Sequence, residues 1–368
     1  MPKTVFRGSI RSLKSAKPGR DGGGCVRIPI NYVGLSILLI LTLAPAVLAQ
    51  AGGEVENTAY RNFYAEQNAQ KKAELGEKFL ADFKESTYRT PILKTILTNY
   101  VQTQNWTKVL EHAEKLPTEL SNADNATKTL VYTYGMAAAQ ATNNAAKTVE
   151  YGDKVLGVDP NNLQAQVFVA TTIPQGMPQD KAANDKALDL AGKALAGVQQ
   201  YFSQPKPAQM TDAQWTQARV EYEDQLHSAR GLIYFNRMDY AKSAEEYMTV
   251  LKNSPKDGVA HFYLGYAYRN QAAELSKTLV EAIKTFDAAR LAKKPQPEID
   301  ELDARRQGAQ DEFSKVRDSA IDSLATAVAI ADARVLQQAK AALETLYKVK
   351  NNDSLDGLDQ LIASKKPK

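Results

Sequence analysis

Histidines are the side chains of this sequence best suited to metal binding or proton transfer, and their spacing supports neither chemistry. The three of them, His112, His227 and His261, are far apart, and none belongs to an HExxH pattern or another metal-ligand spacing. His227 and His261 are 34 residues apart, which would bring them together if the chain repeats with that period. We expect both to pack within helices rather than to form a weak metal site or a pH-sensing pair.

Other kinds of catalysis also lack the residues they need. The only cysteine is Cys25, so the chain after it offers no thiol nucleophile and no zinc cluster. The sequence contains no GxSxG motif, phosphate-binding glycine loop or dinucleotide fingerprint. A helical hydrolase of glycans would need two facing carboxylates, and the scattered acidic residues show no specific pair. We therefore expect no enzyme activity, no cofactor and no metal.

The stretch 226–255 carries the clearest pattern of the chain. The pattern consists of small, aromatic, leucine and proline residues at particular offsets, namely Gly231, Tyr234, Tyr240, Ser243, Tyr247, Leu251 and Pro255. Tetratricopeptide repeats place the same residue types at these offsets, and the stretch resembles one such repeat. The resemblance implies an all-α chain, a right-handed α-solenoid of helix pairs with additional C-terminal capping helices.

A second good match to the repeat follows directly. Its first helix is indicated by His261, Leu264, Gly265 and Tyr268, and its second helix, after about five extra residues, by Ala282, Phe286 and Ala289. The small residues Gly231, Ser243, Gly265 and Ala282 would allow close approach of the two helices. A larger side chain at such a contact typically costs about 1–3 kcal/mol by overpacking.

Weaker repeats precede these two, and other helices follow them. Residues 57–86 have a helical apolar pattern with a break expected near Gly76, and Thr211 or Asp212 is a suitable N-cap for a long helix. The sequence predicts five parts: a signal peptide or signal anchor (1–49), N-terminal repeats (50–202), a Pro-rich connector and the start of a long helix (203–223), the best-formed repeats (224–297), and a charged helix with capping helices (298–368).

The N-terminal segment has the pattern of an export signal. A basic region precedes an uncharged apolar run at 33–49, and Val47 and Ala49 suit a signal-peptidase site with Gln50 as the first mature residue. Cleavage would release a periplasmic or secreted protein. If the run stays uncleaved, it would anchor the chain in the inner membrane, facing the periplasm.

Charge gives no support for nucleic-acid binding. The net charge is +4, but residues 1–49 hold seven Lys or Arg and one Asp, so 39 basic and 41 acidic residues remain after them. The basic character would be lost with the signal segment, and we expect protein or peptide partners instead.

The resemblance also implies a concave groove lined by the first helix of each repeat, where a peptide or a helix of a partner binds. In the two best repeats the groove positions are Phe235, Asn236, Phe262, Tyr266, Arg269 and Asn270. For Phe235 and Phe262 the alternative is packing in the core between repeats, and for the other positions it is a solvated helix face. A carboxylate clamp is not expected, because Thr98 stands where the clamp requires Asn, although Lys94 fits.

These observations favour an exported, non-enzymatic repeat scaffold that binds partner proteins. The alternative is a co-chaperone or adaptor for envelope assembly or secretion, held at the membrane by the uncleaved run 33–49.

Overall fold

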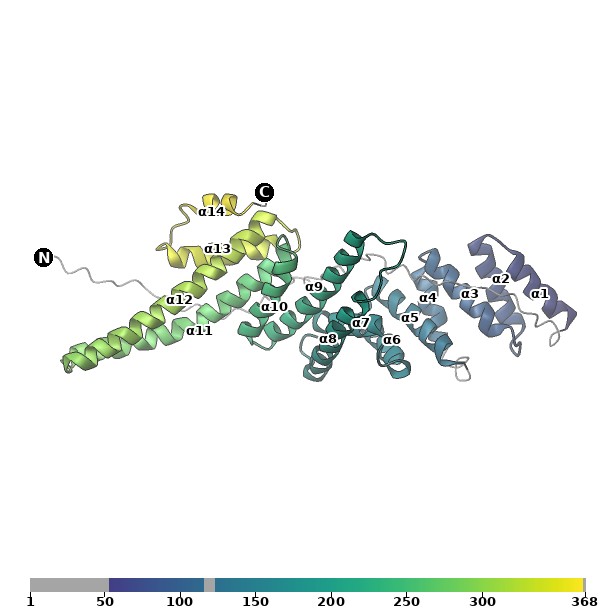
Figure 1. Ribbon diagram of the computed structural model, residues 1–368, viewed down its shortest axis with the longest axis horizontal. Helices are drawn as coiled ribbons and strands as arrows, with labels where there is room; N and C mark the ends of the chain where they lie inside the picture. The colour runs from purple at the N-terminus through teal and green to yellow at the C-terminus, as the bar shows by residue number, and fades with distance from the viewer. Residues whose placement is uncertain (1–52, 116–122, 367–368) are drawn as a thin grey trace. The chain divides into compact units, whose positions relative to one another are not determined.

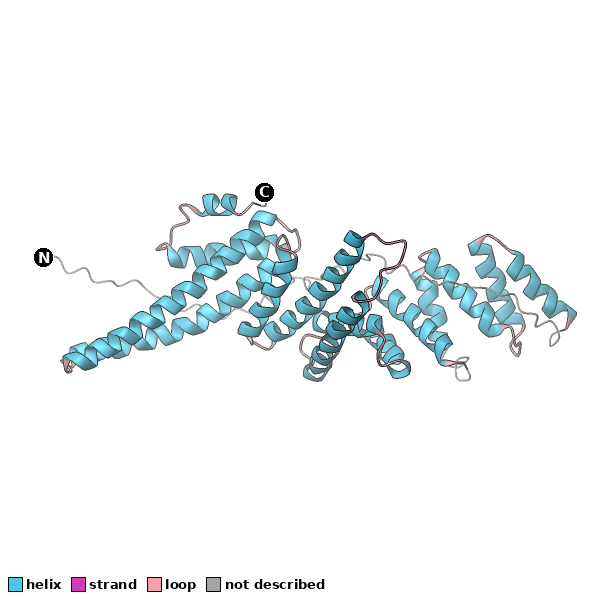
Figure 2. Ribbon diagram, in the orientation of Figure 1, coloured by secondary structure: helices cyan, strands magenta, loops and turns pink. Residues whose placement is uncertain are grey.

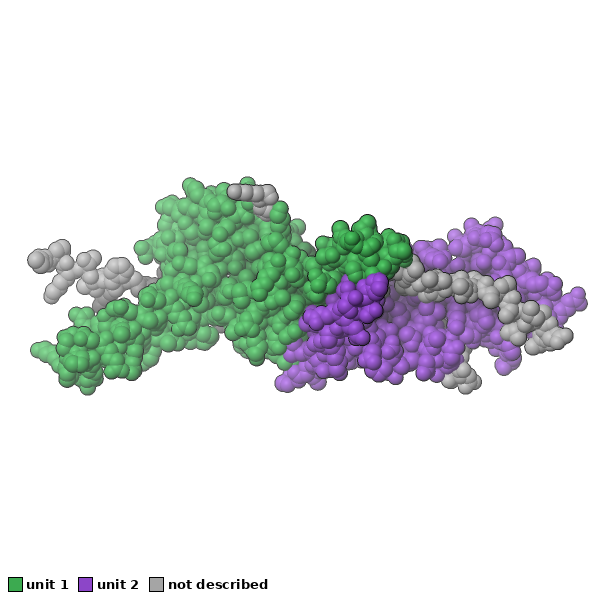
Figure 3. Space-filling model, viewed as in Figure 1, with its two compact units in different colours: residues 1–30, 206–368 green, residues 31–205 purple. Residues whose placement is uncertain are grey.

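The computed structural model describes residues 53–115 and 123–366, and its regular structure over these residues is α-helix alone (Figure 1, Figure 2). The stretch 167–173, whose alternation could also suit a strand, is helical. The described residues belong to two compact units, which we call the N-terminal unit (53–205) and the C-terminal unit (206–366) (Figure 3). The segment 33–49, with its predicted signal or anchor, lies outside the described residues. Within them, no helix is both long and apolar enough to cross a membrane.

Consecutive helices of the N-terminal unit pack against each other as pairs. The helices are α1 (Glu54–Ala65), α2 (Ala69–Asp82), α3 (Arg89–Gln102), α4 (Trp106–Lys115), α5 (Asn125–Ala141), α6 (Ala145–Val158), α7 (Leu163–Gly176) and α8 (Lys181–Phe202). Asn or Asp side chains cap α2, α5, α6, α7 and α8 by accepting a backbone N–H of the first turn. The turns between helices are therefore encoded by single polar residues.

One predicted helix break is misplaced. The chain breaks at residues 66–68, where Asn68 caps α2, and Gly76 lies inside that helix. A Cβ at Gly76 would stand 2.7 Å from Ile96 of α3 and 2.8 Å from Phe63 of α1. The glycine is thus required by close packing of three helices, and it does not end one.

Glycine facing an aromatic ring recurs between the paired helices. A Cβ at Gly135 of α5 would stand 2.9 Å from the Tyr151 ring of α6. In the C-terminal unit, a Cβ at Gly231 would stand 2.8 Å from the Tyr247 ring. Both aromatic residues follow their glycine by 16 positions. This shared contact shows that a helix pair in each unit is packed in the same way.

The C-terminal unit begins with a long helix, and three of its described helices are longer than any described helix of the N-terminal unit. The N-cap of its first helix, α9, is Thr211, which forms a capping box with Gln214. Of the two N-cap residues predicted from the sequence, Thr211 and Asp212, the first is therefore confirmed. The helices are α9 (Asp212–Asn236), α10 (Tyr240–Asn253), α11 (Gly258–Leu291), α12 (Gln296–Ile330), α13 (Leu336–Lys350) and α14 (Leu358–Ser364). The second half of α9 and the whole of α10 form the repeat at 224–257.

The prediction for the next repeat is wrong in its second helix. Ala282 and Phe286 do not start a new helix after a turn, because α11 runs without interruption from Gly258 to Leu291. The KKPQP turn (293–297) instead separates α11 from α12, an antiparallel partner of similar length (Figure 1). The charged segment 298–318 and the first of the predicted capping helices, which we expected to be separate, both belong to α12.

The second half of α12 takes the place of the missing helix. A Cβ at Gly265 would stand 2.6 Å from Leu324 Cγ and 3.2 Å from its backbone nitrogen. Ala320, Leu324 and Ala327 are fully buried and have the same mutual spacing as Ser243, Tyr247 and Val250 in α10. The repeat is therefore complete, but its two helices are separated by an insertion. Ser243 follows Gly231 by 12 positions in the first repeat, whereas Ala320 follows Gly265 by 55 positions in the second.

The inserted residues form a two-helix arm, residues 271–316. Its limbs are about 30 Å long at the usual rise of a helix. Ala272, Leu279 and Phe313 form its buried core, and nearer the tip the Arg290 and Arg306 guanidiniums lie 5.5 and 5.4 Å from the Phe286 ring centre. On the first limb, apolar residues recur at alternating spacings of three and four, which is the pattern of a two-stranded coiled coil. On the second limb the same spacing includes Arg306 between Leu302 and Ala309. Phe286 is thus an arm residue, and α13 and α14 pack on the other half of α12.

Candidate partner-binding surface

Most of the side chains predicted to line the groove are buried in the C-terminal unit. Phe235, Phe262 and Tyr266 belong to its core, with 6%, 2% and 8% of their surface exposed. Asn270 is also buried, whereas Asn236 and Arg269 are half-buried. Phe235 and Phe262 therefore pack in the core, which was the alternative to a place in the groove. Of the six predicted groove residues, Arg269 and Asn236 are the ones that a partner reaches most easily.

Tyr266 lies between an aromatic and a cationic neighbour of its own helix. Its ring centre is 4.6 Å from that of Phe262, and the Arg269 guanidinium lies 5.4 Å from it. Burial raises the pKa of Tyr266 above its usual value, so its hydroxyl stays protonated. Two of the side chains predicted to grip a peptide, Tyr266 and Arg269, thus contact each other along α11.

The signature residues of the repeats act in packing. Ser243 and Tyr247 are fully buried, and the Tyr247 and Tyr263 rings stack with centres 5.2 Å apart. At the edge of the core, Tyr240 lies against Phe235, Lys242 lies over Tyr234, and the Tyr268 hydroxyl donates to Met248 Sδ. Pro255 is exposed after α10, and its carbonyl accepts a hydrogen bond from His261 Nε2 at 3.0 Å.

An open cavity of about 450 Å³ lies in the N-terminal unit between α5 and α7, the first helices of their pairs. Its wall consists of Asn125, Ala126, Thr129, Leu130, Thr133 and Tyr134 from α5, Val158 and Asp159 from the end of α6, and Gln164 from α7. Tyr134 is buried and forms the floor, with its hydroxyl 3.5 Å from Thr98 of α3. We call this site the α5–α7 cavity.

Neutral polar groups in the α5–α7 cavity are available for a ligand. The side chains of Asn125, Thr129, Thr133 and Gln164 make no hydrogen bond to any other described residue. They offer hydroxyl and amide groups that both donate and accept. Asp159 is the one charged residue of the lining, and its two oxygens accept from Asn161 N (3.1 Å) and Asn162 Nδ2 (3.4 Å), which hold the carboxylate in place.

The sequence contained a pattern that would have indicated this cavity. Thr129 precedes Gly135 by six residues, as Gln225 precedes Gly231, so both occupy the same position on the first helix of their repeats, and the resemblance to tetratricopeptide repeats places that position in the groove. Apart from Lys94 and Thr98, groove positions were assigned only in the two best-formed repeats. Applying the same register to the weaker repeats would have found Thr129.

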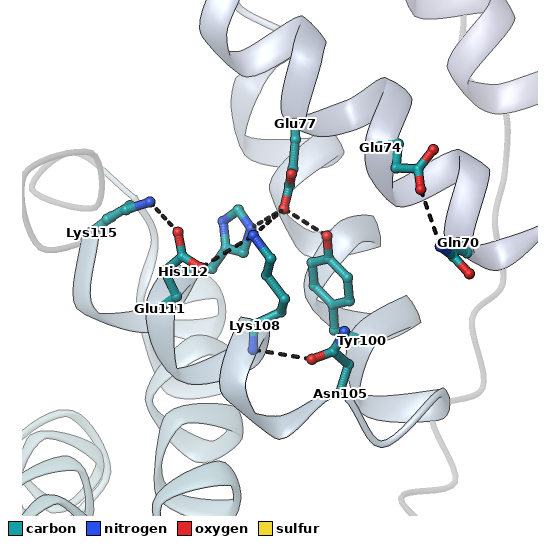
Figure 4. A network of polar contacts seen from close by, with 9 residues as sticks. All are labelled: Gln70, Glu74, Glu77, Tyr100, Asn105, Lys108, Glu111, His112 and Lys115. Carbon is teal, nitrogen blue, oxygen red and sulfur yellow. Dashed lines mark hydrogen bonds and ion pairs between the residues drawn. The ribbon is translucent and has the colours of Figure 1, made fainter.

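A second polar cluster in the N-terminal unit joins three helices around Glu77 of α2 (Figure 4). One oxygen of Glu77 accepts from the Tyr100 hydroxyl at 2.6 Å and from His112 Nε2 at 3.0 Å, and Lys108 Nζ lies 3.5 Å away. Burial alone would raise the pKa of Glu77, but these donors outweigh it and the pKa is lowered. A carboxylate held in this way ties α2, α3 and α4 together.

The other two histidines have separate partners. His227 Nδ1 lies 2.7 Å from Glu246 Oε2, and the Arg230 guanidinium lies 2.8 Å from the other oxygen of the same carboxylate. His261 bonds to the Pro255 carbonyl, and burial lowers its pKa. The His227 side chain is therefore held in an ion cluster between α9 and α10. Over the described residues, no group of three His, Cys, Asp or Glu is placed to hold a metal ion.

Comparisons with known proteins include a likeness to a solved repeat protein. No protein-family model matches the chain, and no curated protein matches it. Among solved structures, the chain is similar to a tetratricopeptide repeat protein from Parabacteroides merdae ATCC 43184, with a TM-score of 0.38 and 11% sequence identity, over 80% of this chain and 100% of that one. The evidence for repeat packing is therefore the recurring contact of glycine with the paired helix in this chain itself.

Proposed function

We propose that this chain is an exported, non-enzymatic scaffold that binds partner proteins through the first helices of its repeats. The observation that carries the proposal is the α5–α7 cavity, where four neutral polar side chains stand without partners among the described residues beside exposed apolar surface. Unused hydrogen-bonding groups around an apolar hollow are what a bound peptide segment requires.

The export part of the proposal rests on the sequence of residues 1–49. A basic region, an apolar run and the small residues Val47 and Ala49 support cleavage before Gln50. The mature protein would then be periplasmic or secreted, and N-terminal sequencing of the purified protein should begin at Gln50. A protein that retains residues 33–49 in the membrane fraction would favour the adaptor held by an uncleaved anchor, for which the long basic region preceding the run is the supporting observation.

The binding part is tested by affinity capture from envelope extract. The bait is the mature chain from Gln50, compared with a Thr129→Lys/Thr133→Lys bait that fills the cavity from two half-buried positions. An Arg269→Ala bait tests the groove predicted on α11. We expect the double lysine bait to lose partners that the wild type recovers. Equal recovery of partners by the wild-type bait and the double lysine bait would show that the α5–α7 cavity is not the binding surface.

A further inference from the structure

The composition of the α5–α7 cavity defines the kind of ligand that it accepts, and this inference rests on the proposed function. Its polar side chains from α5 are Asn125, Thr129 and Thr133, which follow one another at intervals of four residues. Residues four apart on a helix rise by about 6 Å. Two residues of an extended chain span about 6.6 Å, so an extended peptide running along α5 would meet one polar side chain per dipeptide.

Neutral donors and acceptors suit a peptide backbone better than a charged group. The hydroxyl and amide groups of Thr129, Thr133 and Gln164 can pair with both N–H and C=O of such a backbone. No Lys or Arg belongs to the lining, so a C-terminal carboxylate or a phosphate would enter without a counter-charge. The ligand is therefore an internal segment and not a chain end.

The apolar part of the lining lies next to a single negative charge. Leu130 and Val158 are half-buried in the wall, where a ligand side chain would cover them. Asp159 is held by Asn161 and Asn162, and it has no Lys or Arg as an ion-pair partner among the described residues. An apolar side chain in the hollow and a cation beside it would satisfy both features.

We propose that the α5–α7 cavity binds an internal, extended peptide segment in which an apolar residue is adjacent to Lys or Arg. The apolar side chain covers Leu130 and Val158, and the cation pairs with Asp159. Thr129 and Thr133 bond to the peptide backbone, so the sequence requirement is limited to these two side chains.

A library of N-acetylated, C-amidated decapeptides, degenerate at every position, tests the ligand class. Selection on the mature wild-type chain should enrich an apolar residue next to Lys or Arg. In fluorescence anisotropy, Asp159→Asn should weaken the best basic peptide about fivefold, the effect of one exposed ion pair of about 1 kcal/mol. A peptide in which Ala replaces the basic residue should bind Asp159→Asn and wild type with the same affinity.

Thr129→Val/Thr133→Val, which keeps the shape of both side chains, should weaken both peptides about tenfold through lost hydrogen bonds. The matched control is Asp189→Asn on α8, whose carboxylate pairs with Lys193 of its own helix and should not affect binding. Far-UV circular dichroism and thermal unfolding establish that each variant is folded.

Three results would overturn the proposal: peptides selected without a basic residue, equal binding of the best peptide to wild type and Asp159→Asn, or a library that yields no ligand. If affinity capture still depends on the cavity in any of these cases, only the ligand class is wrong. If the wild-type bait captures no partner, the proposed function itself fails.

Discussion

Gly265 shows how one missing side chain determines which helix completes a repeat. Its Cα faces Leu324, a residue 59 positions later in the sequence, and the contact leaves no room for a Cβ. Gly308 lies in the arm, within α12, with open space around the position of its Cβ. The two glycines are thus equivalent in local structure and opposite in packing.

Substitution by alanine should therefore change stability in opposite directions at these two glycines. Gly265→Ala is expected to destabilise the C-terminal unit by about 1–3 kcal/mol through overpacking. Gly308→Ala is expected to stabilise it by about 0.5–1 kcal/mol, because alanine loses less backbone freedom in a helix. Urea unfolding measures both. Leu324→Ala should reduce the stability lost on Gly265→Ala, because it removes the side chain that the new methyl group would meet. Phe286 was the aromatic residue predicted for the second helix of this repeat. If Phe286→Ala reduces that loss and Leu324→Ala does not, Phe286 and not Leu324 faces the glycine.

Glu77 links stability to pH through its lowered pKa. The carboxyl titrates below its ordinary value of 4.5 in the folded chain, so the unfolded chain takes up the proton first as pH falls. Its contribution to stability is present above about pH 4.5 and is lost as pH falls through the lower, folded value. The difference in urea midpoint between wild type and Glu77→Gln should be largest near neutral pH and should shrink below pH 4.5. A difference that grows on acidification would contradict this assignment.

At the scale of elements, ion pairs connect the second helices of successive repeats. Glu77 of α2 pairs with Lys108 of α4 (3.5 Å), Glu114 of α4 with Lys147 of α6 (3.2 Å), and Asp153 of α6 with Lys186 of α8. The lysines follow their acidic partners by 31, 33 and 33 residues. The same contact recurs at each step between pairs, and we call this series the ion-pair ladder.

Removing the ion-pair ladder should weaken the N-terminal unit only at low salt. These pairs are partly exposed, so their attraction is screened by added ions. The triple variant Lys108→Gln/Lys147→Gln/Lys186→Gln should unfold at a lower temperature than wild type in 20 mM NaCl and at nearly the same temperature in 1 M NaCl. Lys181→Gln/Lys193→Gln, which removes pairs within α8 alone, is the control and should change the melting temperature less. If the melting temperature falls equally at both salt concentrations, the aliphatic parts of the lysine side chains stabilise the unit by packing.

The sequence predicted the helix pairs best where a repeat carries a glycine, a facing aromatic residue and a capping turn, as α5–α6 and α9–α10 do. It failed at α11 because residues spaced by three and four look the same in a continuing helix and in a new one. The segment 271–280 contains no Gly, Pro, Asn or Asp that would turn the chain, and this absence was the available evidence against a break. The burial of four predicted groove residues was missed for another reason. Burial of Phe262 and Tyr266 depends on distant parts of the fold, and residue type alone does not record it.

At the scale of the whole molecule, the arm is separable from the repeat that carries it. Asn270 and Arg317 stand at the positions that Asn236 and Tyr240 occupy in the preceding repeat, where three residues (237–239) make the turn. Replacing 271–316 by Arg-Met-Asp should therefore leave a folded chain, because Gly265 still meets Leu324. Circular dichroism and a single cooperative thermal transition for the C-terminal unit check this. A variant that aggregates or loses its helices would show that the arm is needed for folding.

The central claim is that partners bind the first helices of the repeats and not the second. A photo-crosslinking amino acid placed in living cells at Thr133 of α5 tests it most directly, with Glu150 on the exposed face of α6 as the paired position. We expect a crosslinked partner from position 133 and none from position 150. Crosslinks of equal yield from both positions, or from position 150 alone, would contradict it.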